Sequence, residues 1–162
     1  MTPRNPILIR FSRGTGWQGA VVRWATWSWA AHVGFRLSDG RLLDATPQFG
    51  VSIRTATDDD TARYFLPRAP QDLVRNAVAY AAQQVGKPYD WTAIIGVAMR
   101  GDWHKPDKWF CSELIEAAMY EAGCELLNDD NHVDRITPRD LLLSPRMTPY
   151  QLTPPPATLS VF

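Results

Sequence analysis

The spacing of apolar residues changes at Pro70 and divides the chain into a strand-rich part and a helical part. Before Pro70, short apolar runs are separated by polar turns, which is typical of β-strands. After Pro70, apolar residues recur at intervals of three and four, which is typical of helices with one buried face. Strands followed by helices in this order favour an α+β fold with a mainly antiparallel sheet.

The same patterns predict the individual elements. Gly14 to Gly16 should break the chain after the first strand, and Gly86 and Pro88 should end the helix that begins after Pro70. We expect strands at residues 6–12, 32–37, 41–46, 50–55 and 63–67, and helices at 17–28, 73–85 and 111–122. A short helix should open at Thr137-Pro138, where threonine caps and proline takes the first position. The proline-rich residues from about 149 onward are predicted to form an irregular tail.

Length and charge narrow the class of protein. With 162 residues and neither an internal repeat nor a linker, residues 1–162 are expected to form one domain. The formal net charge is zero, which argues against a nucleic-acid partner. The longest apolar run, residues 93–99, is far shorter than the roughly 20 residues of a membrane span, so no stable membrane insertion is expected. The first residues do not resemble a signal peptide, and we expect a cytoplasmic protein as synthesised.

The chain has two cysteines, and both are predicted to be free thiols. Cys111 and Cys124 should lie at opposite ends of one helix, roughly 20 Å apart at about 1.5 Å per residue. A disulfide needs Cα atoms within about 7 Å. Cys111 should begin the helix, where backbone N–H groups and the helix dipole stabilise a thiolate, although a free cysteine often only fills space. Cys124 follows the glycine cap with no positive charge nearby, and we expect it to be inert.

A predicted β-hairpin places a histidine near an acid. Asp39-Gly40 separates two strand-like runs and favours a tight turn. If the turn has two residues, Phe35 lies opposite Asp44. His32 is then about one residue pair further along the hairpin from Asp44. Asp44 could then orient the imidazole of His32 and fix its tautomer. A thiol, an imidazole and an orienting acid are the minimum set for nucleophilic acyl transfer.

Three segments resemble the NlpC-type cysteine peptidases. AAHVGFRLSDGRLLDA (30–45) is similar to the family's histidine hairpin, in which a third polar residue, here Asp44, follows the histidine by twelve positions. VGKPYDW (85–91) and WFCSELI (109–115) are similar to the segments around the family's nucleophile. The histidine segment usually follows the cysteine segment, whereas here it precedes it. This order matches the circularly permuted, YiiX-like branch of the papain-like fold, and the resemblance covers roughly residues 6–123.

The resemblance implies roles for individual residues. Cys111 would be the nucleophile, His32 its base and Asp44 the third member of a triad, with the backbone N–H of Cys111 as one oxyanion donor. Tyr89 would be a second donor, unless it only packs the loop after Pro88. Tyr89, Trp29 and Ser112 are assigned to transition-state or substrate binding. The chain departs from the family pattern in three ways: Phe110 stands where an aspartate usually precedes the cysteine, the third residue is less often aspartate, and a Gly-Gly after the Tyr-x-Trp segment is missing.

The implied activity is that of a thiol hydrolase which cleaves an amide bond, by resemblance in the stem peptides of peptidoglycan. Such an enzyme, lacking an export signal, would need a secretion machine, a phage particle or release at lysis to reach a cell wall. Otherwise it would act on a cytoplasmic substrate. A second interpretation is a lipid-directed acyl hydrolase or acyltransferase similar to lecithin retinol acyltransferase, and a third is a non-catalytic binding domain. Tryptophans 24, 27 and 29 could line a substrate groove, contact a lipid interface or pack in the core. No cofactor is expected, and no metal, because residues 129–132 (DDNH) lack partner ligands at a recognised spacing.

Overall fold

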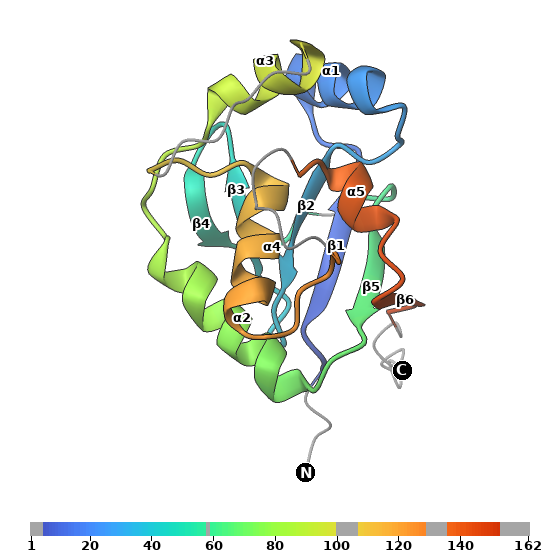
Figure 1. Cartoon of the computed structure of the whole chain (residues 1–162), viewed down its shortest axis with the longest axis vertical. Helices are drawn as coiled ribbons and strands as arrows, with labels where there is room; N and C mark the ends of the chain where they lie inside the picture. Colours follow the sequence, from blue (N-terminus) through green and yellow to red (C-terminus); the bar gives the residue numbers. More distant parts are fainter. Residues whose placement is uncertain (1–4, 58, 100–106, 129–135, 153–162) are drawn as a thin grey trace, which may run out of the picture.

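The computed structural model describes residues 5–57, 59–99, 107–128 and 136–152 (Figure 1). The strands are β1 (Leu8–Ser12), β2 (His32–Arg36), β3 (Leu42–Thr46), β4 (Gly50–Arg54), β5 (Arg63–Pro67) and β6 (Met147–Tyr150). The helices are α1 (Gly16–Thr26), α2 (Gln71–Gln83), α3 (Trp91–Met99), α4 (Cys111–Glu121) and α5 (Pro138–Leu142). None of the described helices is long and apolar enough to cross a membrane.

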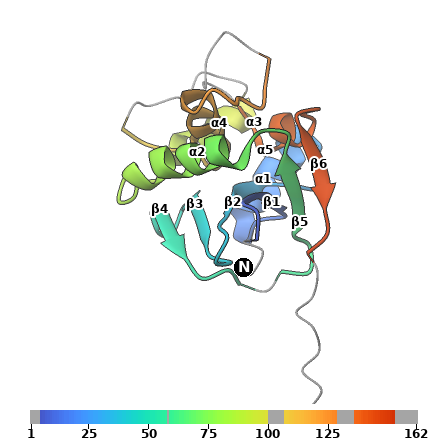
Figure 2. The same ribbon diagram turned by 90° about the horizontal axis from the view of Figure 1, so that it is seen from below.

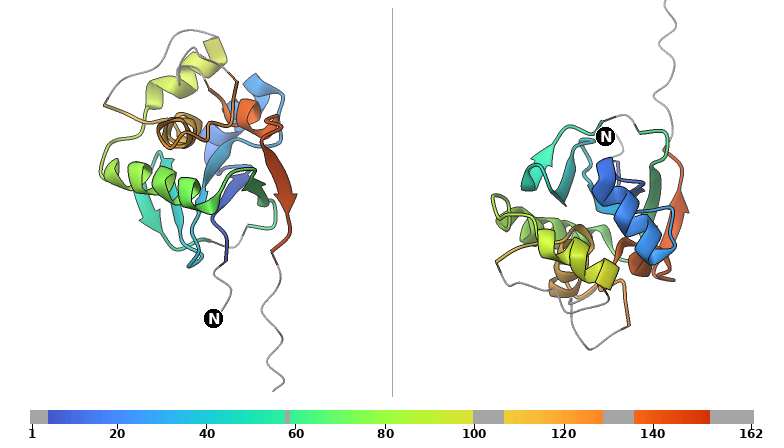
Figure 3. Two further views of the ribbon diagram at one scale, coloured as in Figure 1. Left: turned by 60° about the horizontal axis from the view of Figure 1, so that its bottom comes forward. Right: turned by 90° about the horizontal axis from the view of Figure 1, so that it is seen from above.

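The described strands form one antiparallel sheet in the order β4-β3-β2-β1-β5-β6. Helix α4 packs against β2 and β3, and α2 lies beside α4 on the same face of the sheet (Figure 2). Helices α1 and α3 lie side by side across one end of the sheet (Figure 3). The predicted α+β class, with an antiparallel sheet and the cysteine helix packed against it, is confirmed.

Helix α4 is the central helix of the core. Residues 111–119 are all buried, because the sheet covers one side of the helix and α2 and α5 cover others. Leu114, Ile115 and Met119 supply the apolar contacts, and Phe110 precedes the helix with no exposed surface. The helix ends where predicted, with Gly123 in the left-handed region at φ +70°. Its first residue, Cys111, is therefore fixed relative to the strands beneath it.

The β2–β3 hairpin has a three-residue loop, so the predicted two-residue turn is wrong. The Leu37 N–H donates to the Arg41 carbonyl at 2.8 Å, and Gly40 takes φ +87° at the end of the loop. This is the three-residue turn that needs glycine in the left-handed position. The register shifts by one residue, and Phe35 lies opposite Leu43 rather than opposite Asp44. A shift of one residue moves every side chain to the other face of the sheet.

Two elements escaped the sequence patterns. Helix α3 (WTAIIGVAM) is a nearly continuous run of apolar residues. It shows no helical periodicity and was therefore not predicted. Strand β6 contains Pro149 and lies at the edge of the sheet, where the missing N–H of proline is tolerated. The prediction that the chain is irregular from about 149 is therefore wrong for Pro149 and Tyr150. The prolines at 154–156 lie outside the described residues.

The outer tryptophans of the first helix are not core residues. Helix α1 buries Gly19, Val22 and Thr26, whereas Trp24 and Trp27 are 73% and 86% exposed. The core interpretation of these two tryptophans is wrong, because Gly19, Val22 and Thr26, and not the tryptophans, face the interior of the protein.

Candidate active site

The hairpin brings His32 and Asp44 together on one face of the sheet. Nε2 of His32 lies 2.8 Å from Oδ2 of Asp44. The observed register explains this contact: Asp44 projects from β3 at the level of Gly34, two residues from His32 and on the same face. In the predicted register, the two side chains would have pointed to opposite faces. The predicted contact between His32 and Asp44 is therefore present, but it arises from a different alignment of β2 and β3.

Gly34 makes room for the carboxylate. A Cβ atom at Gly34 would lie 2.8 Å from Cβ of Asp44, closer than two carbon atoms can approach without displacement. The backbone of β2 is here ordinary extended chain, so glycine is required by contact and not by conformation. The glycine of the His-Val-Gly segment thus keeps Asp44 beside His32.

We predict that Gly34→Ala will displace Asp44 and disturb its contact with His32. Overpacking of this kind lowers the free energy of unfolding by about 1–3 kcal/mol, and we expect slower alkylation of Cys111 as well. Gly123→Ala is the control, because it strains a left-handed residue far from the hairpin with nothing within 4 Å of the new Cβ. Denaturant titration and thiol alkylation measure the two effects. Alkylation that slows equally in both variants would assign the loss to general destabilisation.

Asp44 has a second partner that sequence reasoning missed. Nη2 of Arg54 on β4 donates to the same carboxylate oxygen at 2.8 Å, and Asp44 is only 1% exposed. Burial opposes the charge of Asp44, but the hydrogen bond and charge of His32 and the charge of Arg54 lower its pKa below the ordinary value. Pairing β3 with β4 places Ser52 opposite Asp44 and Arg54 two residues along on the same face. The predicted strands could have revealed this arginine.

Cys111 lies at the start of α4, near enough to His32 to influence the pKa of the imidazole. Burial of His32 opposes a positive charge, yet the hydrogen bond that its ring donates to Asp44 and the interaction with Cys111 raise its pKa from 6.5 to about 10. The histidine is therefore an imidazolium at neutral pH, held between an acid and a sulfur.

Tyr89 lies next to this group. It is buried, pairs its backbone with Trp109 just before α4, and contacts the ring of Phe110 with centroids 5.9 Å apart. Burial and the charges of Cys111, Asp90 and Glu113 raise the pKa of Tyr89 well above its ordinary value. The phenol stays protonated and can act as a hydrogen-bond donor beside the sulfur.

Two residues assigned by resemblance lie elsewhere. Ser112 is buried, and its hydroxyl donates to the Ile136 carbonyl at 2.5 Å, which ties α4 to the segment before α5. Trp29 follows α1 with 38% of its surface exposed and is not among the residues that line the pocket beside His32. Cys111 and Cys124 are both free thiols, as predicted.

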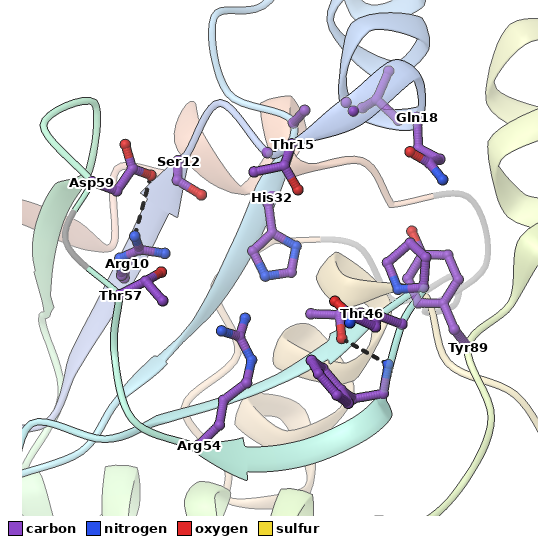
Figure 4. A pocket seen from close by; sticks show the side chains of 18 residues that line it. Arg10, Ser12, Thr15, Gln18, His32, Thr46, Arg54, Thr57, Asp59 and Tyr89 are labelled. Carbon is purple, nitrogen blue, oxygen red and sulfur yellow. Dashed lines mark hydrogen bonds and ion pairs between the residues drawn. The ribbon is translucent and has the colours of Figure 1, made fainter.

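A pocket of about 470 Å³ opens over His32 (Figure 4). Its walls come from β1, the start of α1, the β3–β4 loop and Tyr89. Five polar side chains line the pocket on one side of the imidazole: Arg10, Ser12, Arg54, Thr57 and Asp59. Arg10 is nine-tenths buried and forms an ion pair with Asp59 at 3.2 Å. The pocket has the size of a small-molecule or peptide-residue site.

The sheet, the central helix and the reversed order of histidine and cysteine define a YiiX-like, papain-like fold. A crystal structure described as metalloprotein yiiX from Escherichia coli O157:H7 (DUF1105) is similar to this chain with a TM-score of 0.70. The two share 16% sequence identity, and the match covers 96% of this chain and 100% of that one. No protein-family model matches the sequence, and no curated protein does. The similarity therefore establishes the fold.

The description of the similar structure as a metalloprotein prompts a test of the donor groups. Across the described ranges 5–57, 59–99, 107–128 and 136–152, no three His, Cys, Asp or Glu side chains are grouped so that they could hold a metal ion. The carboxylate of Asp44 is already bound by His32 and Arg54. The described residues do not fit a metal centre at this site, and residues 129–132 lie outside the described part of the chain.

Proposed function

We propose that the protein is a cysteine-dependent acyl hydrolase with Cys111, His32 and Asp44 as its triad. The observation that carries the proposal is the position of His32, whose Nε2 lies 2.8 Å from a buried carboxylate and whose pKa is influenced by the cysteine that begins α4. A YiiX-like fold is compatible with a papain-like hydrolase. Thiol, imidazole and orienting acid supply the nucleophile, the proton carrier and the group that fixes the tautomer.

The reaction would proceed through an acyl-enzyme. In the proposed resting pair the proton of Cys111 already lies on His32, and the thiolate attacks the carbonyl carbon of the substrate. The backbone N–H of Cys111, unpaired within the first turn of α4, and the phenol of Tyr89 stabilise the oxyanion. His32 protonates the leaving amine or alcohol as the carbon–heteroatom bond breaks. A water molecule then loses a proton to His32 and attacks the thioester, which releases a carboxylic acid and the Cys111 thiolate and restores the proposed pair.

We propose an amide as the substrate bond, with peptidoglycan stem peptides as the first class to test. The polar wall supports a peptide-like substrate, because Arg10, Ser12 and Thr57 can hydrogen-bond carbonyl and carboxylate groups. A lipid acyl ester is the second candidate. The exposed tryptophans of α1 favour it, since indole side chains suit the membrane interface.

Digestion of purified cell-wall sacculi by the wild type and by Cys111→Ser tests the substrate class. We expect new stem-peptide fragments in the mass spectrum of the soluble fraction with the wild type only. Extracted phospholipids, analysed for released fatty acid, form the parallel assay. Cleavage of neither substrate, or equal cleavage by both proteins, would contradict the proposed hydrolase for these substrates.

A further inference from the structure

The end of the molecule above the pocket carries an unusual number of exposed tryptophans. Trp17, Trp24 and Trp27 belong to α1 or its C-terminal cap and are 62%, 73% and 86% exposed. Trp91 and Ile95, one turn apart on α3, are 44% and 61% exposed. These five residues are called the tryptophan surface below. Because α1 and α3 lie side by side across one end of the sheet, they present one continuous outer layer (Figure 3).

Helical spacing and ring contacts hold this surface together. Trp17 and Trp24 are seven residues apart and lie on the same stripe of α1. That stripe is opposite Gly19, Val22 and Thr26, which face the protein. Trp17 stacks on Trp91 with centroids 6.5 Å apart, which joins the two helices. The exposed indoles thus form a defined layer rather than scattered surface residues.

The conformation of Trp27 is not what folding alone would select. It takes φ +52° as the C-cap of α1, a left-handed position for which glycine is preferred. Its indole is nevertheless the most exposed of these tryptophans and gains little burial in return. A large, exposed side chain at a conformationally costly position points to contact with something outside the chain.

The charges around this surface select the kind of contact. Residues 13–32 contain two arginines, Arg13 and Arg23, and neither Asp nor Glu, and α3 carries no charged residue. Arg13 is exposed, and the side chain of Arg23 donates to its carbonyl at 2.5 Å. Arg139 of α5 is exposed and donates to the Thr26 carbonyl at 2.6 Å, at the end of α1. Its neighbour Asp140 is engaged in capping α5. The tryptophan surface is therefore bordered by positive charge.

We propose that the tryptophan surface docks onto an anionic phospholipid membrane. Indoles lie at the level of lipid headgroups, and arginines beside them are attracted to anionic lipid. A second copy of the chain fits less well, because a two-fold contact would bring the same arginines face to face without a compensating acid. Docking would be peripheral, in keeping with the lack of a spanning helix among the described residues.

Docking at this surface would place the pocket mouth against the membrane. Gly16 and Gln18 line the pocket, and Trp17 lies between them. Tyr89 also lines it and contacts the ring of Trp91 with centroids 5.8 Å apart. Taken with the proposed hydrolase, on which this step rests, the substrate would be a molecule anchored in the membrane, with its scissile carbonyl near the headgroups.

Vesicle flotation with the full chain tests the docking itself. The probes are vesicles of phosphatidylcholine alone and vesicles of phosphatidylcholine mixed with phosphatidylglycerol. We expect binding to the anionic vesicles, weaker binding at high salt, and a blue shift of tryptophan fluorescence on binding. The double variant Trp24→Ala/Trp27→Ala should bind these vesicles about tenfold more weakly or worse.

Three controls separate the outcomes. Tyr120→Ala removes an aromatic ring of similar exposure, 60%, from the far end of α4 and should bind as the wild type does. Cys111 in the double variant should be alkylated at the wild-type rate, which shows that the fold is intact. Cys111→Ala should still bind vesicles. If Cys111 of the wild type proves unreactive while the protein binds vesicles, only the hydrolase proposal is rejected. Wild-type protein that ignores anionic vesicles, or a double variant that binds equally well, would overturn the docking proposal. The proposal would also be overturned if the wild type formed a dimer and bound no vesicles, while the double variant was a monomer.

Discussion

Iodoacetamide is expected to label Cys111 much faster than Cys124 at pH 6, and His32→Ala should slow the labelling of Cys111 by about 100-fold. The reactive species is the thiolate, and in the proposed pair the positive charge of His32 stabilises it. Cys111 is only 1% exposed, so a small reagent is needed. Replacing His32 by alanine removes side-chain atoms near Cys111, and reduced access therefore cannot explain a slower reaction.

Cys124 is the internal control in the same chain. Burial and the charges of Glu125 and Glu116 raise its pKa above the ordinary value, so it is mostly a thiol at this pH. Mass spectrometry of tryptic peptides reports both cysteines from one reaction. Equal rates at Cys111 and Cys124, or a His32→Ala variant that reacts like the wild type, would refute the thiolate–imidazolium pair.

The second large effect is expected at Asp44. Asp44→Ala should lower the free energy of unfolding by about 3 kcal/mol, because it leaves Arg54 and His32 without their buried carboxylate. Asp39→Ala is a matched control: Asp39 also pairs with an arginine, Arg41, at 2.7 Å, but the pair is half exposed. Exposed pairs contribute about 1 kcal/mol or less. Urea titrations measure the free energy of unfolding of both variants. Equal losses in Asp44→Ala and Asp39→Ala would contradict the proposed stabilisation by Asp44.

The pH dependence of stability follows from the direction of the two pKa shifts. Because the pKa of Asp44 is lowered in the folded state, ionised Asp44 stabilises the fold at any pH above the ordinary pKa of an aspartate. This contribution is lost as the pH falls through the pKa of Asp44 in the folded state. The raised pKa of His32 stabilises the fold fully below pH 6.5 and loses this contribution as the pH rises to about 10. Asp44→Asn should therefore differ most from the wild type between these limits. Urea titrations across the range measure the difference, and a difference independent of pH would contradict the assignment.

The sequence was most informative where local chemistry decides the structure. Asp39-Gly40 located the hairpin, and Gly123 located the end of α4. Thr137 capped α5 as predicted, by accepting from the backbone of Asp140. In each case the residue type itself sets the backbone conformation or supplies the missing hydrogen bond. These features fixed the α+β class and the start of the helix that carries Cys111.

The sequence failed where geometry depends on neighbours in space. The hairpin register differed by one residue, and the side of β3 that carries Asp44 depends on that single residue. Gly34 and Arg54 acquire their significance only once β2, β3 and β4 are aligned. The outward face of α1 was also hidden, because an exposed tryptophan stripe and a buried one have the same spacing.

The most direct test of the central claim is the alkylation rate of Cys111 in the wild type as a function of pH. The proposed thiolate–imidazolium pair predicts a rate that is already high near pH 5–6 and nearly constant through neutral pH. In His32→Ala the rate should instead rise steeply around the range of an ordinary thiol, about pH 8.5. A wild-type profile that rises only in that alkaline range would show that Cys111 and His32 do not form a thiolate–imidazolium pair.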